Sequence, residues 1–380
     1  MKFSISFFKY TAMVVAALCM ASCDDDDDES DDNDTELQQV VSQYVNSVVI
    51  PTYRSLADES MGLADACIAL RSDAAQAKVK AACDKWIAAR KYWEQSEAFL
   101  YGAAADYNID PHIDSWPLDK AQLDIALKNT ALMESLADDD LSGLETLGYG
   151  LLGFHAVEYV LFRDGQDRAV SDISENELVF CAAVAQDLRN QCIRLEASWC
   201  GIDNVTSAKK EILEDAELEP TNDYGEMMKT AGMPGNSHYK TQMSAIVQIL
   251  QGASDISDEV GNTKITDPVS SGNVLDVESW YSWNSIADFA DNIRSVQHAY
   301  NGGLSATPQE HSVSSIVRSK KASLDDDLKI AIANAISEIE AMPAPFRNHL
   351  TEIETNKAKQ ACNVVFSKLE ETIEFLQENK

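Results

Sequence analysis

Apolar residues recur at intervals of three and four along most of the chain, which is the spacing of amphipathic helices. The pattern is clear from Leu37 to Val48 and again from Trp86 to Phe99. Strand signals are nearly absent. We therefore expect helices near 36–70 (broken or kinked at Pro51), 74–101, 119–136, 143–163, 176–200, 239–261, 276–301, 323–341 and 349–378. The fold class that this pattern predicts is all-α.

The length of the chain indicates two domains, because residues 36–380 are too many for one compact core. Helices ending in SEAFLYG and VQHAYNG echo each other, each after a long helix and before two more. We expect two packed four-helix-bundle-like domains, 36–170 and 171–380, related by an internal duplication. Residues 201–238 contain short ambiguous pieces and resemble a long excursion.

The N-terminus has the features of an export signal. Residues 1–22 combine Lys2 and Lys9 with a short apolar run that is too short to span a bilayer. The segment MASC resembles a lipobox, which predicts cleavage before Cys23 and lipidation of that cysteine. The acidic run after it predicts a disordered tether over 23–35. Such a protein would be an outer-membrane or cell-surface lipoprotein of a Gram-negative envelope, with a periplasm-facing anchor as the alternative.

The charge is strongly negative, −33 for the whole chain. Loss of residues 1–22 removes two lysines and no acid, which gives −35. This excludes nucleic acid as a partner and favours cations or basic peptides. Membrane attachment must then depend on the acyl chains, because anionic lipid would repel the protein.

Six cysteines remain after the signal and Cys23 are set aside: Cys67, Cys83, Cys181, Cys192, Cys200 and Cys362. An even number permits disulfides in an oxidising compartment, but no spacing is typical of structural zinc. Cys181 and Cys192 would share one helix face and could not bridge each other. For most of the six we favour the role of small buried apolar residues.

The sharpest chemical feature is GFHAVE, in which His155 and Glu158 stand three apart on a strongly apolar helix. A buried carboxylate requires a cation or a hydrogen-bond partner, and a structural His–Glu pair is the simpler alternative to a metal site. A second helix places Glu94 and Glu97 at the same spacing, beside Trp93 and Phe99. Helical bundles build metal sites from such residues on facing helices.

Five segments together resemble the successive motifs of the imelysin family. They are ARKYWEQSEAFLYG, DPHIDSWPLD, GFHAVEYVLF, DEVGNTKITDP and ESWYSWNSIADFADNIRSVQHAYNG. The resemblance covers nearly the whole mature chain. It implies two packed helical bundles, with the GxHxxE helix near their interface, a place outside the cytoplasm and a link to iron or other metal uptake beside transport components.

The resemblance also implies site residues. The metal ligands would be Glu94, Glu97, Asp114, His155 and Glu158. Interface residues, or residues bordering the ligands, would be Arg90, Ser96, Trp116, Asp119, Tyr281, Asp288, Asn292 and Arg294, with Asp288 and Arg294 orienting a ligand or pairing with each other. Lys91 replaces the usual proline and, if it points inward, would compete with a metal for Glu94. His112 fits no family position and is expected to face solvent from its loop.

Three functions remain open. The first is binding of a divalent or ferric cation, with iron ahead of zinc, in metal uptake. The second is a metallopeptidase, with Glu158 as ligand or catalytic base. The third is a module that binds an organic ligand or a protein without metal. We favour binding, because Glu158 cannot easily be both ligand and base and a bundle has no strand edge to hold a peptide.

Overall fold

The computed structural model describes the backbone of residues 27–379 and the side chains of residues 35–379. The predicted signal peptide and Cys23 lie outside the described residues. The prediction of an all-α protein is confirmed, since 74% of the residues that the structure describes are helical. Within the described part, strand structure is limited to one hairpin, β1 (Phe162–Arg163) with β2 (Gln166–Asp167).

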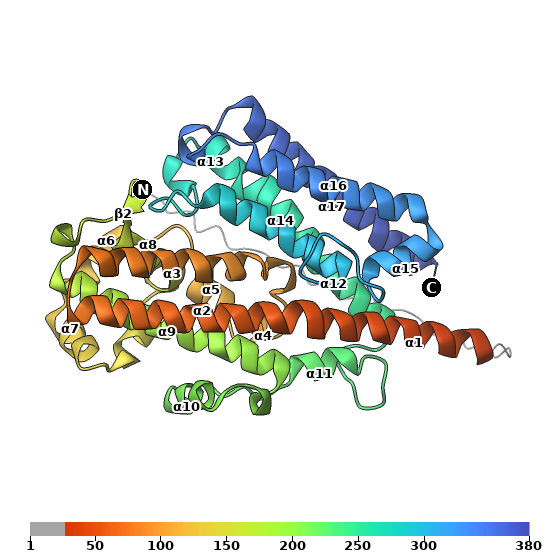
Figure 1. Cartoon of the computed structure of the whole chain (residues 1–380), viewed down its shortest axis with the longest axis horizontal. Helices are drawn as coiled ribbons and strands as arrows, with labels where there is room; N and C mark the ends of the chain where they lie inside the picture. Colours follow the sequence, from red (N-terminus) through yellow and green to blue (C-terminus); the bar gives the residue numbers. More distant parts are fainter. Residues whose placement is uncertain (1–26, 380) are drawn as a thin grey trace, which may run out of the picture.

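Eight helices form two closed rings of four, so that each ring is a four-helix bundle (Figure 1). The first bundle consists of α2 (Ile50–Ser72), α3 (Gln76–Glu94), α8 (Gly153–Leu161) and α9 (Glu175–Cys200). The second consists of α12 (Gln242–Glu259), α14 (Ser285–Asn301), α16 (Ala322–Glu340) and α17 (Ile353–Glu378). Two bundles are therefore present as predicted, whereas their origin by duplication stays a prediction.

Shorter helices surround these bundles. Beside the first lie α4 (Ala103–Asp106), α5 (Ile109–Ile113), α6 (Lys120–Ala126), α7 (Thr130–Ala137), α10 (Ser207–Asp215) and α11 (Tyr224–Lys229). With the second lie α13 (Thr266–Ser271) and α15 (Val313–Lys320). The predicted excursion over 201–238 thus contains α10 and α11. In the described residues no helix is both long and apolar enough to cross a bilayer.

The domain boundary predicted between residues 170 and 171 does not match the packing. Helix α9 follows that boundary, yet it packs against α2, α7 and α8 of the N-terminal half. The reason is its composition, because most of its length is buried, including Phe180, Leu188 and Trp199. A helix that is apolar on several sides needs the interior of a bundle, and α9 supplies the fourth side of the first one.

The acidic segment also differs from the expectation of a disordered tether over 23–35. Helix α1 (Asp27–Tyr44) begins inside it, and a π-helical turn, η1 (Val45–Val49), joins α1 to α2. Acidic residues at a helix N-terminus interact favourably with the helix dipole, which is compatible with the early start. The irregularity expected at Pro51 takes the form of this π turn, and Pro51 itself lies in the first turn of α2.

Four other predicted helices are shorter than expected. The one predicted over 143–163 is reduced to α8, and two 3-10 turns, η3 (Leu141–Thr146) and η4 (Tyr149–Leu151), precede it. Helix α3 ends at Glu94 and a 3-10 turn, η2 (Glu97–Phe99), follows it. The segment 119–136 is divided into α6 and α7, because Asn129 caps the second helix. Asp276 ends a 3-10 turn, η8 (Val274–Asp276), and residues 277–284 form a loop before α14 rather than its first turns. Apolar periodicity did not reveal these interruptions, because apolar residues in the turns and loops continue the helical spacing.

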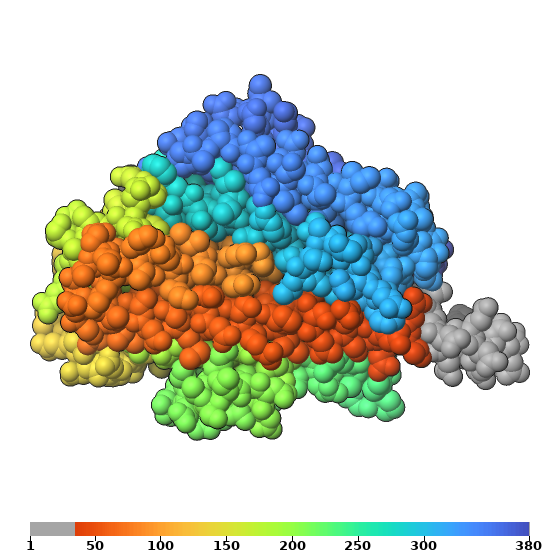
Figure 2. Space-filling view, viewed as in Figure 1, coloured from red at the N-terminus to blue at the C-terminus, as the bar shows by residue number. Residues whose placement is uncertain are grey.

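The two bundles meet face to face, with the second bundle (cyan to blue) seated along α3 in Figure 2. Turn η2 packs against α12 so closely that a Cβ at Gly252 would lie 2.2 Å from the carbonyl oxygen of Ala98. Asn292 and Ser295 of α14 bond to residues of the same α3–η2 segment. The end of α3, which carries the predicted Glu94 and Glu97, therefore lies at the interface.

All six cysteines considered above are buried with free thiols. The interpretation of them as small buried residues is thereby confirmed in this structure. Only one pair among the described cysteines makes contact, Cys67 with Cys181, at 3.7 Å between the Sγ atoms.

Candidate functional site

Five segments converge on one buried cluster between the bundles: the end of α3, the loop after α5, the start of α8, the π-helical turn η7 (Val260–Lys264) and the loop before α14. Gly153 opens α8 with a φ of +69°, and a Cβ there would lie 2.0 Å from the carbonyl oxygen of Ile113. The glycine of the GxHxxE motif thus lets the helix of His155 approach the loop of Asp114.

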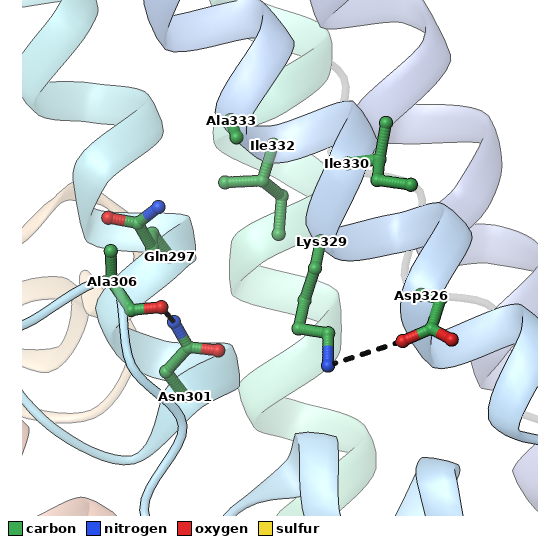
Figure 3. Close-up of a pocket in the computed structure, with 8 residues that line it drawn as sticks. All are labelled: Gln297, Asn301, Ala306, Asp326, Lys329, Ile330, Ile332 and Ala333. Atoms are coloured by element: carbon green, nitrogen blue, oxygen red, sulfur yellow. Dashed lines mark hydrogen bonds and ion pairs between the residues drawn. The ribbon is translucent and has the colours of Figure 1, made fainter.

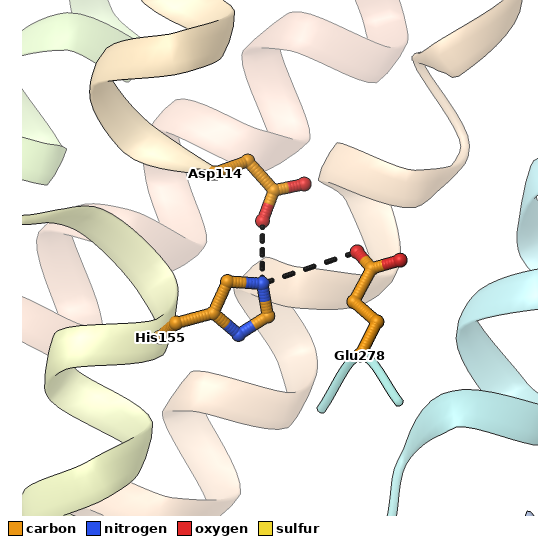
Figure 4. Close-up of side chains that lie close together, drawn as sticks. All are labelled: Asp114, His155 and Glu278. Carbon is orange, nitrogen blue, oxygen red and sulfur yellow. Dashed lines mark ion pairs between the residues drawn. The ribbon is translucent and has the colours of Figure 1, made fainter. Parts of the chain in front are cut away.

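His155 lies at the centre of this cluster and is fully buried. Its Nδ1 is 3.0 Å from Glu158 Oε2. Its Nε2 is 3.2 Å from Asp114 Oδ1 and 3.9 Å from Glu278 Oε1 (Figure 4). Burial alone would lower the pKa of His155, but the interactions with Asp114 and Glu158 raise that pKa to about 9. The ring of Trp116 packs edge-on against the imidazole at 4.6 Å.

Glu158 lies behind the imidazole rather than beside the other carboxylates. Its Oε1 accepts hydrogen bonds from the backbone N–H of Tyr281 (3.0 Å), the backbone N–H of Ser282 (2.7 Å) and the Ser282 hydroxyl (2.7 Å). Both oxygens are therefore engaged. Glu158 orients His155 and at the same time joins α8 to the loop before α14.

Arg90 is the cationic centre of the cluster. Its guanidinium contacts Asp114, lies 2.5 Å from both Glu94 and Glu278, and lies 3.8 Å from Asp288. The Arg90 side chain has no exposed surface. A buried guanidinium requires such compensation, and here it comes from both halves of the chain.

Lys264 is a second buried cation, which the sequence analysis missed. Its Nζ lies 3.1 Å from Glu278 Oε2, 3.9 Å from Glu97 and 4.0 Å from Glu94. Lys91, which was expected to compete with a metal if it pointed inward, is instead exposed. The ammonium placed to compete with a metal is therefore that of Lys264, in the π-helical turn η7 that precedes α13.

The carboxylates of the cluster fall into two electrostatic classes. Burial would raise all their pKa values, but Arg90 lowers that of Asp114 and Lys264 with Arg90 lowers that of Glu278. For Glu94 burial prevails over Arg90 and Lys264, and for Glu97 it prevails over Lys264, so that the pKa of each carboxyl is raised well above its ordinary value. Asp114 and Glu278 are therefore the more acidic carboxyls of the cluster, and Glu94 and Glu97 are the less acidic ones.

Two groups of side chains have the geometry of metal ligands, and both contain Asp114. One is Asp114 with His155 and Glu278, and the other is Asp114 with Glu94 and Glu97. In each group the ligand atoms lie within 4.8 Å of one another. Glu278 was not singled out from the sequence, although it is the first residue of the last imelysin-like motif.

Several polar atoms of this cluster are buried without a hydrogen-bond partner among the protein atoms. They are Arg90 Nε, Glu94 Oε1, Trp116 Nε1, His155 Nε2 and Asn292 Oδ1. Two of them are nevertheless close to a charged group, Glu94 Oε1 at 2.5 Å from Arg90 and His155 Nε2 at 3.2 Å from Asp114. Buried polar atoms are nearly always satisfied, by protein, water or ligand. Such a concentration at one place indicates a site that takes up water or a ligand.

The remaining predicted interface residues divide between the cluster and elsewhere. Asp288 accepts hydrogen bonds from Ser279 (2.5 Å) and Asn284 (2.6 Å) beside Arg90. Asn292 donates to Glu94. Ser96 is buried but bonds only to the carbonyl oxygen of Trp93.

The predictions for Asp119 and for His112, and the pairing of Arg294 with Asp288, are wrong. Asp119 is exposed and caps α6 by accepting from the N–H of Gln122. Arg294 pairs with Asp291 and Glu340 rather than with Asp288, because residues six apart on α14 lie on different faces. His112 is half-buried and bonds to Asp187 at 2.7 Å.

A separate cavity of about 450 Å³ lies between α14 and α16 of the second bundle (Figure 3). It is lined by Gln297, Asn301, Ala306, Asp326, Lys329, Ile330, Ile332 and Ala333. Lys329 is paired there with Asp325 at 2.5 Å. This cavity contains none of the predicted site residues, so the interface cluster is the stronger candidate.

Comparison with known proteins agrees with this architecture. The family model described as imelysin matches residues 49–373. Iron-regulated protein A of Synechococcus elongatus is 25% identical over 336 residues, which covers 88% of this chain and 84% of the relative.

Two crystal structures also match. That of a putative iron-regulated protein A precursor from Parabacteroides distasonis is 31% identical, with a TM-score of 0.78 over 90% of this chain and 95% of the other. An imelysin-like protein from Psychrobacter arcticum shares the fold at 13% identity, with a TM-score of 0.58 over 90% and 92%. The chain belongs to the imelysin family.

Proposed function

We propose that this protein binds a metal cation between its two bundles, through Asp114, His155 and Glu278, as part of iron uptake in the cell envelope. The observation that carries the proposal is the state of His155. Glu158 holds Nδ1, while Nε2 faces two carboxylates, that of Asp114 at 3.2 Å and that of Glu278 at 3.9 Å. A carboxylate that orients a histidine from behind is the usual support for a metal-binding imidazole.

The second group, Glu94 with Glu97 and Asp114, extends the same site with oxygen ligands. Imidazole and carboxylate ligands suit ferrous, ferric and zinc ions alike. Iron is the favoured ion, because the relatives from Synechococcus and Parabacteroides bear the name iron-regulated protein A. Glu158, with both oxygens engaged, supports His155 rather than binding the ion.

The cations of the site define how a metal would bind. Arg90 and Lys264 neutralise the carboxylates, and His155, with its pKa of about 9, carries a proton at neutral pH. A metal must therefore displace that proton and compete with the two side chains. Affinity should increase as the pH rises towards 9, because ligand deprotonation then costs less.

The first test is elemental analysis of the protein purified without chelators, followed by titration with ferrous, ferric and zinc ions by calorimetry. We expect one ion per chain and at least a hundredfold loss of affinity in His155→Gln. His112→Gln, which changes a half-buried histidine outside the cluster, is the matched control and should bind normally. Equal affinities of wild type and His155→Gln would contradict the proposal.

A second variant separates a metal site from an anion site. Lys264→Met removes the ammonium beside Glu278 while keeping the length of the side chain. A metal would then meet less competition and should bind more tightly. If Lys264→Met instead binds every metal more weakly, the site depends on its cations, and the alternative of an organic anion gains support.

The metallopeptidase alternative has less support from the geometry. Peptide hydrolysis needs a general base near the metal and room for an extended substrate. Glu158 has both oxygens engaged, and the His155 and Glu158 side chains have no exposed surface. Binding and release of an ion need less access than a peptide does, so the arrangement favours binding.

The N-terminal sequence supports an exported lipoprotein anchored through Cys23, facing the cell surface or the periplasm and working beside metal-transport components. Cys23→Ser should release a soluble protein with an unchanged circular dichroism spectrum. Incorporation of labelled fatty acid measures the modification directly. Absence of label in the wild-type chain would refute the anchor without touching the metal site.

A further inference from the structure

The contact between Cys67 and Cys181 stands apart from the interface cluster. Cys67 lies on α2 and Cys181 on α9, two helices that pack side by side in the first bundle (Figure 1). Their Sγ atoms are 3.7 Å apart, and both residues are 1% exposed. Among the described cysteines, the remaining four have no sulfur neighbour at such a distance, and Cys83 and Cys200 contact backbone carbonyl oxygens instead.

We propose that Cys67 and Cys181 form a disulfide in the mature protein, joining α2 to α9. A disulfide requires the two Sγ atoms to approach to about 2.0 Å. The present separation is a contact between facing side chains on neighbouring helices, so the remaining movement is small. Cys181 and Cys192, by contrast, lie on the same helix and cannot bridge.

Burial fixes when the bond forms. At 1% exposure neither thiol is open to an oxidant once the bundle is closed, and burial together with the neighbouring thiol makes Cys181 a poor thiolate. The bond must therefore form while the chain folds. The oxidant would be the disulfide of a thiol–disulfide oxidoreductase, the class that oxidises exported proteins.

The reaction is an exchange in two steps. The thiolate of one cysteine attacks the enzyme disulfide and forms a mixed disulfide, and the thiolate of the second cysteine then displaces the enzyme. One Sγ–Sγ bond forms in the protein and one breaks in the enzyme. Two electrons pass to the enzyme, and the two protons lost from the cysteines are recovered on its two thiols.

The bond would support the proposed metal site from behind. Helix α2 packs against α3, which carries Arg90 and Glu94, and α9 packs against α8, which carries His155. A covalent link between α2 and α9 therefore holds together the two helices that back the N-terminal half of the cluster. The two cysteines are 114 positions apart in the sequence, and the constraint that a cross-link places on the unfolded chain increases with the length of the loop.

The experiment is peptide mapping of the full-length protein recovered from the cell envelope, denatured and alkylated during lysis without reductant. We expect one cross-linked peptide pair that contains Cys67 and Cys181, whereas Cys83, Cys192, Cys200 and Cys362 should be alkylated. The pair should be absent from Cys67→Ala, in which Cys181 becomes alkylated. Cys83→Ala, a buried cysteine of the same bundle, is the matched control and should retain the pair.

A second arm separates the bond from the place where it forms, because the proposal rests on the exported location. The reduced chain is refolded in a glutathione redox buffer and mapped in the same way. The pair in both samples supports the proposal. The pair after refolding alone supports the cross-link and contradicts export through an oxidising compartment. Free Cys67 and Cys181 in both samples, or a bond from either to another cysteine, would overturn it.

Thermal unfolding gives an independent readout. Reduction should lower the melting temperature of the wild-type protein by about 5 °C or more, the order expected for a loop of this length. Reduction should leave the melting temperature of Cys67→Ala unchanged. Equal shifts in the two proteins would mean that the stabilising bond is not the one between Cys67 and Cys181.

Discussion

Glu158 offers the most direct test of how the two bundles are joined. Its carboxylate accepts three hydrogen bonds from Tyr281 and Ser282 and faces His155 Nδ1, all in a buried environment. Glu158→Ala leaves four donors without this acceptor. Loss of one partner from a buried charged network costs about 3–5 kcal/mol, because the abandoned groups stay desolvated.

Glu158→Gln separates hydrogen bonding from charge. Its amide oxygen can still accept from Tyr281 and Ser282, but the negative charge beside His155 is lost. We expect a smaller loss of about 1–2 kcal/mol, together with a decrease in the pKa of His155, since Glu158 is one of the groups that raise it. Glu145→Ala, at an exposed glutamate, should change stability by less than about 0.5 kcal/mol.

Urea unfolding followed by circular dichroism measures the free energies, and NMR titration of the imidazole measures the pKa. The reasoning would be refuted if Glu158→Ala lost less than about 1 kcal/mol, since buried donors cannot be abandoned so cheaply. It would also fail if the Gln and Ala variants were equally unstable. In that event the side-chain amide of the Glu158→Gln variant would not restore any of the stability that the hydrogen bonds to the loop before α14 provide.

Three further predictions concern pH, packing and capping. The pKa of His155 is raised from 6.5 to about 9 in the folded protein, so its contribution of about 3 kcal/mol to stability is complete below pH 6.5 and is lost as the pH rises through 9. In urea unfolding, the free energies of wild type and His155→Gln should therefore become more similar as the pH rises. A difference that stays constant with pH would contradict this prediction. Gly252→Ala should lower the free energy of unfolding by about 2 kcal/mol or more, whereas Gly148→Ala, with open space around it, should be nearly neutral in the same assay. Asp119→Ala should lower the free energy of unfolding by about 1 kcal/mol through loss of the cap on α6, and should leave metal affinity in the titrations unchanged. Weaker metal binding by this variant would mean that Asp119 does contribute to the site.

The fold was largely predictable because most of its helices have one apolar face, which a single sequence displays. Periodicity located α9, α16 and α17 to within a few residues of their bounds. It failed for residues 277–284, where a partly buried loop keeps the apolar periodicity without being helical. It also could not reveal that α9 closes the first bundle, because partner choice depends on contacts between helices far apart in the sequence.

Three residues of the site could be predicted from the sequence, but the balance of charge around them could not. His155, Glu158 and Asp114 could be inferred, since a buried carboxylate or imidazole on an apolar helix requires an explanation. Lys264 lies in a polar stretch and Glu278 in an aromatic one, and neither stretch indicates that its charged residue turns inward. What places them is the π-helical turn η7 and the loop after Val277, which are features of the backbone rather than of residue type.

That balance of charge also limits what the site can do. Arg90 and Lys264 already pair with the carboxylates that a bound cation would otherwise neutralise, so these buried carboxylates are stabilised without an ion. A site of this kind keeps its shape when empty and gives up part of its binding energy to displace its own cations. Moderate affinity that depends on pH is the expected consequence. Such affinity suits a protein that hands its ion to a transport component better than one that stores it, and a dissociation rate measured by competition with a chelator distinguishes the two: exchange within seconds supports transfer, and retention for hours supports storage.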